Sequence, residues 1–204
     1  MMVTIRIAGL VLGLALLGGC VSQSTRMTKS LAADHSTVPP GKALIVFMRP
    51  SRYGGAIQST VYDVGQPADA FLGIVSGKTK LAYAAEPGKH LFMVVGENAD
   101  FLDAQLEPGK TYYVLVSPRM GMWKARFSLL PIHNQTTAKY SLKSSEFAEW
   151  QHETEWVDKT AAAEQWYQEN RQNVASKRQD YLAKWNARSA ADKAELSLHG
   201  EDGV

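Results

Sequence analysis

Cysteine is nearly absent from this chain of 204 residues, since Cys20 is its only one. A lone thiol cannot form a disulfide within the chain, so the fold has to be held by other contacts. Net charge is also small, at +2, and hydrophobic residues make up an ordinary 45%. The composition therefore predicts a globular chain of one or two domains that does not bind nucleic acid.

No apolar run is long enough for a bilayer-spanning helix, which needs ~20 residues. The run that follows Arg6 covers residues 7–17, and two glycines separate it from Cys20. A short basic start, an apolar stretch and small residues predict a secretory signal peptide over residues 1–19 that is removed on maturation. The alternatives are an uncleaved anchor or a cysteine placed there by chance.

The segment from Leu17 to Cys20 resembles the lipobox of bacterial lipoproteins, with Leu at −3, small residues at −2 and −1, and Cys at +1. The resemblance implies that Cys20 is lipidated on sulfur, becomes the new N-terminus and is then acylated, for example with palmitate. Three acyl chains exceed the two membrane signals that stable anchoring needs. By analogy with enterobacterial sorting, Val21 after the cysteine points to the outer membrane, with the protein in the periplasm.

Composition divides the chain after the signal peptide into parts. Residues 20–39 are rich in Ser and Thr and end in two prolines, which predicts a flexible tether that reaches roughly 65 Å when fully extended. Residues 40–132 contain eight short strand-like runs separated by turn residues, so we expect an antiparallel β-sandwich of about 7–8 strands. Charge is uneven, with 13 Lys/Arg and 8 Asp/Glu over residues 20–142 but 8 and 12 over residues 143–204.

Two of the strand-like runs have clear patterns. Residues 42–49 are continuously apolar after Lys42, as expected of a strand that is buried on both faces. Residues 122–130 alternate, which predicts that Phe127 faces the core and that Arg126 and Ser128 face outward.

Glycine and proline are both missing over about fifty residues that follow Ser144. With apolar residues at helical spacing, residues 143–196 predict a helical tail, formed either by one long helix or by helical segments with a break or kink in the Ala-rich middle. Ser144 or Ser145 is suited to cap its start. We expect its apolar stripe to pack on the sandwich or to pair with another helix. Residues 197–204 contain two glycines and predict a disordered end.

The tripeptide Gly-Lys-Thr occurs at residues 77–79 and 109–111 and raises the question of a nucleotide-binding loop. Such a loop needs a further glycine five residues earlier, where this chain has Leu72 and Ala104. Both tripeptides precede strand-like rather than helical runs, so no helix N-terminus would face a phosphate. The sequence therefore predicts no nucleotide and no other cofactor.

Pro-Gly-Lys occurs three times, at residues 40–42, 87–89 and 108–110, and an apolar run follows each copy. Proline and glycine at the second and third positions favour a type II turn, because glycine adopts the positive φ that this turn requires. The repeated tripeptide is thus typical of turns between strands rather than of a site.

The segments PPGKALIVFMRP, EPGKHLFMVVGE and EPGKTYYVLV together resemble a family of short bacterial lipoprotein β-domains of unknown function. They are also similar to the wider class of carboxypeptidase-regulatory-like, transthyretin-type β-sandwiches. The resemblance covers about residues 39–132 and departs at STVYDVGQPADAFLGIV, where the family has a shorter hairpin. It implies a β-sandwich adhesion or scaffolding module without an assigned catalytic residue.

Patterns that indicate catalysis or metal binding are scarce. Among five scattered histidines, only His152 has carboxylates three residues away on both sides, and such a group is more often a solvated charge cluster than a metal site. The loops over residues 50–56 and 118–123 are the best candidates for a binding surface, because Arg, Tyr, Trp and Met are enriched at interfaces. The candidate binding residues are Arg52, Tyr53, Arg119, Met120 and Trp123. Alternatively, the two aromatic residues cap the core and the arginines are solvated.

The hypothesis that these features favour is a non-enzymatic envelope lipoprotein, with a membrane anchor at Cys20 and a protein partner for residues 143–196. A second hypothesis is a hydrolase of envelope polymers that uses Asp63, Asp100 or Asp103. A third is that the acidic tail masks the basic sandwich of the same chain.

Overall fold

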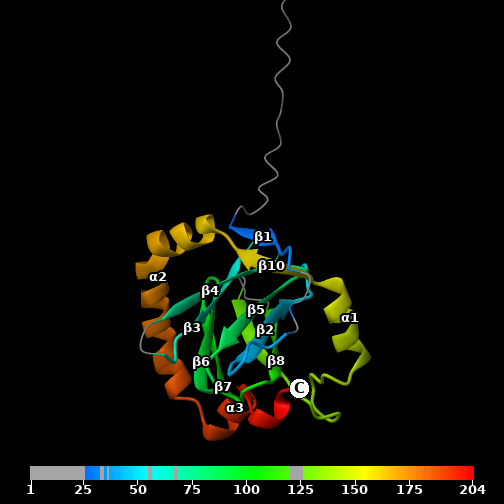
Figure 1. Cartoon of the computed structure of the whole chain (residues 1–204). Helices are drawn as coiled ribbons and strands as arrows, with labels where there is room; N and C mark the ends of the chain where they lie inside the picture. Colours follow the sequence, from blue (N-terminus) through cyan, green and yellow to red (C-terminus); the bar gives the residue numbers. More distant parts are fainter. Residues whose placement is uncertain (1–25, 33–34, 36, 55–56, 67–68, 120–125) are drawn as a thin grey trace, which may run out of the picture.

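The computed structural model describes residues 26–32, 35, 37–54, 57–66, 69–119 and 126–204. Two β-sheets lie face to face, and a helix covers the outer face of each, so the layers run helix, sheet, sheet, helix (Figure 1). The strands are β1 (Met27–Lys29), β2 (Ala43–Arg49), β3 (Ser59–Asp63), β4 (Ala70–Val75), β5 (Thr79–Ala85), β6 (Gly88–Val95), β7 (Ala99–Leu106), β8 (Thr111–Arg119), β9 (Arg126–Ile132), β10 (Glu155–Lys159) and β11 (Ser197–Leu198). The helices are α1 (Ser145–Glu153), α2 (Ala161–Asn186), α3 (Ala190–Ala194) and the 3-10 helix η1 (Gly200–Asp202).

All eight strands expected within residues 40–132 are present, as β2 to β9. The expected antiparallel pairing, however, is wrong for part of the fold, because both sheets are mixed. One sheet has the order β1-β10-β5-β2-β8-β9 and the other β11-β7-β6-β3-β4. The pairs β2–β8, β5–β10 and β7–β11 are parallel. Parallel pairing needs a long connection, and β2 and β8 are joined by a chain segment that builds most of the second sheet.

The continuous apolar run of β2 is buried on both faces, as the sequence predicts. Ile45 and Phe47 point between the two sheets, whereas Val46 and Met48 point to the opposite side. That outer side is covered by α1 through Phe147 and by further side chains of the same cluster. Because successive side chains of a strand alternate between faces, only a sheet that is covered on both sides can bury every residue.

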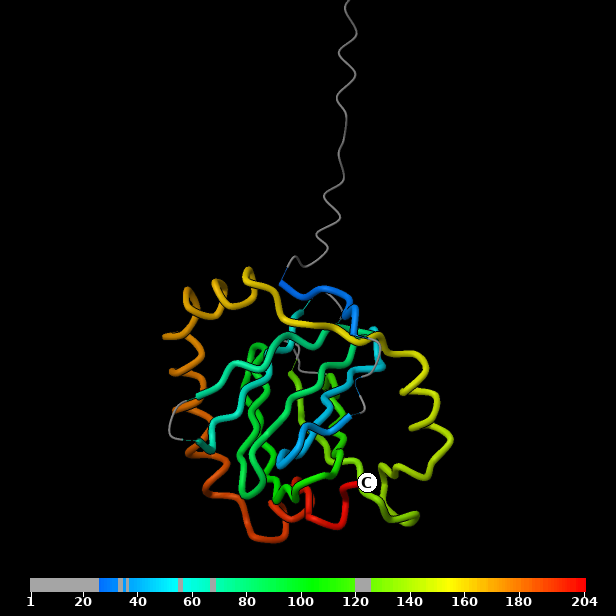
Figure 2. Tube along the Cα trace, viewed as in Figure 1, coloured from blue at the N-terminus to red at the C-terminus, as the bar shows by residue number. Residues whose placement is uncertain are grey.

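Residues 143–196 do not form one helical tail, because β10 interrupts it between α1 and α2. Figure 2 shows this segment crossing one end of the sandwich, from the helix on one face to the helix on the other. The start of α1 is capped as expected, with the Ser144 hydroxyl accepting from the backbone N–H of Phe147. The apolar face of α2 packs on the second sheet through Ala163, Tyr167 and Val174, among others.

Two ends of the chain are more ordered than the sequence predicts. Part of the expected tether forms β1, which pairs with β10. The expected disordered end instead forms β11 and η1, and Val204 exchanges backbone hydrogen bonds of 3.0 and 2.7 Å with Thr111. Both short strands depend on partners far away in sequence, which local composition does not reveal.

Two of the three Pro-Gly-Lys copies, at residues 40–42 and 108–110, form turns before strands, as predicted, whereas Gly88 of the third copy has φ of +127° and is already the first residue of β6. Gly41 and Gly109 each have φ of +76°, the value that the third position of a type II turn requires. Thr111, two residues after Gly109, begins β8, and Thr79 of the other Gly-Lys-Thr copy begins β5. Neither tripeptide precedes a helix.

Candidate functional site

Asp100 is the centre of a polar cluster at one end of the sandwich. It is the second residue of β7 and is almost fully buried. One carboxylate oxygen accepts hydrogen bonds from Arg119 Nη2 and Ser128 Oγ, both at 2.7 Å, and the other accepts from Arg188 Nη2 at 3.3 Å. Four segments of the chain thus meet at one carboxylate.

Arg119, Arg126 and Arg188 are each positioned by the end of an element. Arg119 closes β8 and Arg126 opens β9, and the two are directly paired in the antiparallel ladder. Arg188 follows the C-cap of α2, where its backbone N–H donates to Trp185 O and its guanidinium lies 5.4 Å from the centroid of the indole ring. A cation is favoured there, because the C-terminal end of a helix carries partial negative charge.

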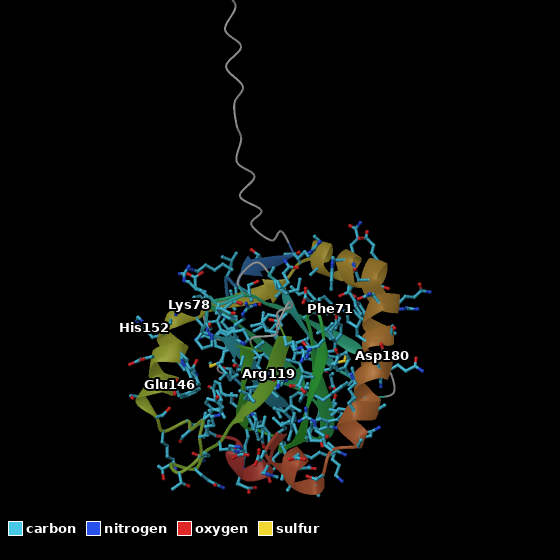
Figure 3. The ribbon with its side chains drawn as sticks, turned by 180° about the vertical axis from the view of Figure 1, so that it is seen from behind. Phe71, Lys78, Arg119, Glu146, His152 and Asp180 are labelled. Atoms are coloured by element: carbon cyan, nitrogen blue, oxygen red, sulfur yellow. The ribbon has the colours of Figure 1, made fainter. Side chains whose placement is uncertain are left out.

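These residues line a cleft of about 330 Å³, which we name the Asp100 cleft. Its walls combine charged groups with the aromatic side chains of Tyr181 and Trp185. The cations that line it are Arg119, Arg126, Lys184 and Arg188. Asp100 is the one carboxylate among these lining residues. Figure 3 shows Arg119 on the face that lies between α1 and α2.

Of the five sequence-predicted binding residues the structure describes Arg52, Tyr53 and Arg119, which lie at or just after the same end of the paired parallel strands β2 and β8. Arg119 lines the Asp100 cleft, whereas Arg52 and Tyr53 do not. Tyr53 is 55% exposed and does not cap the core. Cys20, Met120 and Trp123 lie outside the residues that the structure describes.

Arg49 explains the shape of the loop that carries Arg52 and Tyr53. Its buried guanidinium donates to the backbone oxygens of Tyr53, Gly54 and Ile57 at 2.8–3.0 Å. It also lies 4.6 Å from the ring centroid of Phe127. Burial lowers the pKa of Arg49 to about 10, so the group remains charged at neutral pH. This arginine supports the loop and does not line the Asp100 cleft.

The three aspartates of the hydrolase hypothesis have separate surroundings. Asp63 is buried against His90, and Asp100 is bound by two arginines and a serine. Burial raises the pKa of Asp103, and Lys193 and Lys89 partly offset the increase. Along β7, residues 100 and 103 point to opposite faces of the sheet. The three carboxylates therefore do not converge on one substrate position.

Sequence reasoning missed the buried pair of Asp63 and His90. The two side chains meet at 2.7 Å between His90 Nδ1 and Asp63 Oδ2, and the second ring nitrogen lies 2.7 Å from Glu86 O. A similar pair joins His133 to Asp202 at 3.0 Å. Burial opposes ionisation of Asp202, but hydrogen bonds from His133 and from the backbone N–H of His199 outweigh it, and its pKa is lowered.

Ion pairs between the tail (residues 143–196) and the sandwich are of two kinds: a tail carboxylate with a sandwich cation, and tail cations with sandwich carboxylates. Glu153 of α1 pairs with Lys78, as the masking hypothesis expects. Arg178 and Arg188, by contrast, reach from the tail to aspartates of the sandwich. Within the described ranges, no group of three or more His, Cys, Asp or Glu side chains is arranged to hold a metal ion.

Comparison with known proteins finds no protein-family model that matches the chain and no curated protein that is similar to it. Among the residues that the structure describes, no helix is both long and apolar enough to cross a membrane.

Proposed function

We propose that this protein is a lipid-anchored, non-enzymatic binding module of a bacterial cell envelope, and that the Asp100 cleft is its ligand site. The observation that supports the binding role is the excess of cations around the single carboxylate of the cleft. A concave site with aromatic walls and a few polar groups is the usual form of a small-ligand site. Charge of one sign in such a cleft attracts a ligand of the opposite sign.

The anchoring part of the proposal rests on the segment from Leu17 to Cys20, together with the signal-like residues before it. Acyl chains on Cys20 would hold the protein at the outer membrane, facing the periplasm. The resemblance of residues 39–132 to a lipoprotein β-domain family supports the same location. A protein partner, if the tail has one, would contact the exposed faces of α1 and α2, because their apolar faces pack on the sheets.

Membrane fractionation of cells that express the full chain tests the anchor. We expect the wild-type protein in the membrane fraction and Cys20→Ser in the unprocessed form, with the signal still attached and no acyl groups detected by mass spectrometry. Ser22→Ala, two residues away, is the matched control and should behave as wild type. Equal acylation and processing of Cys20→Ser and wild type would refute the anchor.

The alternative is a hydrolase of envelope polymers that uses aspartates of the β domain. The feature that favours it is the raised pKa of Asp103, because a general acid needs a pKa closer to the working pH. Turnover of cell-wall fragments by the purified protein, lost in Asp103→Asn but retained in Asp158→Asn, would support this function. Absence of turnover in the wild-type protein would leave the binding role as the better account.

A further inference from the structure

Four cations line the Asp100 cleft against its one carboxylate, and the adjoining hollow, which shares Asp100, Arg119 and Arg188, adds Asp192 and Glu195. Asp100 accepts hydrogen bonds from Arg119 and Arg188, so its single charge is shared between two cations. Arg126 and Lys184 also line the cleft, and no carboxylate among the described residues forms an ion pair with either. A ligand with more than one negative charge would restore the balance.

The position of Arg119 directly opposite Arg126 also indicates that the Asp100 cleft attracts an anion. These residues face each other across the last pair of the β8–β9 ladder. Like charges directly opposite one another destabilise a strand pair. Asp100 relieves the repulsion on the side of Arg119, and an external anion would relieve it on the side of Arg126, which is exposed to solvent.

Hydrogen-bond donors remain for such an anion. A guanidinium carries five N–H donors in a planar fork, and Arg119 and Arg188 each use Nη2 for Asp100. The fork matches the oxygens of phosphate and carboxylate groups. Lys184, whose Nζ lies 4.3 Å from the ring centroid of Tyr181, adds a compact charge to the lining of the cleft.

We propose that the Asp100 cleft binds a phosphate monoester. This inference rests on the proposed binding role and names the ligand class. A phosphate monoester carries about −1.5 to −2 charges at pH 7 and three acceptor oxygens on one atom. A carboxylate brings one charge and two oxygens, whereas two lining cations, Arg126 and Lys184, have no ion-pair partner among the described residues. The volume of about 330 Å³ suits a small ester, and the half-buried ring of Tyr181 offers apolar surface for its organic part.

Asp100 has a structural role in this site. By holding Arg119 and Arg188 together it fixes their forks and ties the end of α2 to the sheet. For that reason Asp100, Arg119 and Arg188 are poor targets for mutation, since their loss alters the fold as well as the charge. Arg126 and Lys184 are better targets, because no ion pair or side-chain hydrogen bond within the described residues depends on them.

Isothermal titration of the full lipidated protein in neutral detergent, at low ionic strength, tests the proposal. Glycerol 3-phosphate is the probe, and citrate and glycerol are the comparison ligands. We expect glycerol 3-phosphate to bind and glycerol not to bind. Arg126→Ala and Lys184→Ala should each weaken binding about tenfold, because each removes a charge-assisted contact. Arg171→Ala, which removes an exposed cation from α2 outside the cleft, should leave binding unchanged.

Two sources of the phosphate group are separated by a second arm of the experiment. Phosphatidic acid dissolved in the same neutral-detergent micelles is titrated into the protein, and its affinity is compared with that of the soluble ester. Binding that needs Arg126 and Lys184 supports the proposal in either arm, and the tighter arm identifies the source. At 0.5 M salt the affinity should fall in both arms, because exposed ion pairs are screened.

Two results would overturn the inference. If glycerol 3-phosphate does not bind, or binds equally to wild type and to the Arg126→Ala/Lys184→Ala double variant, the cleft does not hold phosphate. If citrate binds more tightly and needs the same two residues, the binding role stands and only the phosphate class is wrong. Neither result bears on the anchor at Cys20, which fractionation and mass spectrometry test separately.

Discussion

His90 lies between two hydrogen-bond acceptors in the core. Nδ1 contacts Asp63 Oδ2 and Nε2 contacts Glu86 O, each at 2.7 Å. A backbone oxygen and an ionised carboxylate can only accept, so both ring nitrogens must carry protons for both bonds to form. Burial acts to lower the pKa of His90, but the bonds to Asp63 and Glu86 outweigh it, and the pKa is raised from 6.5. The pair is therefore a buried ion pair without a free nitrogen for catalysis.

We predict that His90 stays protonated above pH 6.5, the ordinary value for histidine. Because its folded pKa exceeds its unfolded pKa, its contribution to the free energy of unfolding is complete below about pH 6.5 and is lost as pH rises through the folded pKa. NMR of the ring nitrogens across this range measures the titration. Asp63→Asn should lower the folded pKa, whereas Asp158→Asn, at an exposed carboxylate, should not. A neutral His90 ring at pH 6.5 in the wild type would contradict the assignment.

Helix α2 is anchored at its C-terminal end by Trp185. The side chain is 4% exposed, and its ring lies 6.0 Å from that of Phe101 on the sheet. Lys177 donates to Gly96 O at 2.6 Å and Arg178 pairs with Asp69 at 2.8 Å, so polar contacts continue along the same helix. The tail thus belongs to the folded core rather than forming a separate arm.

Trp185→Ala should lower the free energy of unfolding by about 3–5 kcal/mol, since it leaves a large cavity between α2 and the sheet. Urea denaturation measures the change. Tyr53→Ala, at a side chain that is 55% exposed, should alter it by less than about 0.5 kcal/mol. If α2 were free of the sandwich in solution, the two variants would be equally stable.

Strand β10 shows why sequence predicts some elements and misses others. Strands β2 to β9 can be predicted from the sequence, because each is an apolar run bounded by local turn residues. Residues 155–159 lie in a stretch without Gly or Pro, and they become a strand through distant partners. Glu155 N–H donates to Lys78 O and Ser30 N–H to Trp156 O, both at 2.9 Å. Because the pairing partners are far away in the sequence, residues 155–159 alone do not predict a strand.

The Asp100 cleft was only partly foreseeable for the same reason. Arg119 stood out as a cation in a strand-end loop, but its partner Arg188 is nearly seventy residues away in the chain. Ser128 was expected to face outward by alternation, yet it is buried because its hydroxyl donates to Asp100. Sequence identifies residue types that suit a site, whereas the two sheets and the end of α2 decide which of them meet.

At the scale of the whole molecule, the first described residue is tied to the folded domain. Arg26 O accepts from Thr160 N at 3.0 Å and from Thr160 Oγ1 at 2.8 Å. Its guanidinium donates to Gln58 Oε1 at 2.9 Å and lies 5.4 Å from the ring centroid of Trp166. The expected tether of residues 20–39 is therefore shortened. Six residues from Cys20 to Arg26 span at most about 20 Å, compared with roughly 65 Å for the longer tether.

If Cys20 is lipidated, this geometry predicts that the end of the molecule with β1 and β10 faces the membrane. Leu31, just after β1, is 97% exposed, and α3 lies at the opposite end of the molecule (Figure 1).

Because lipidation consumes the chain's only cysteine, Leu31→Cys and Ala191→Cys each introduce a single free thiol for a donor dye. In vesicles with an acceptor lipid, energy transfer should be strong from position 31 and weak from position 191. Ten Gly-Ser repeats inserted before Arg26 should reduce the difference in energy transfer between the two positions, because a longer linker lets the domain rotate relative to the membrane. Equal transfer from both positions in the unmodified chain would show that the contact between Arg26 and Thr160 does not hold the domain against the bilayer.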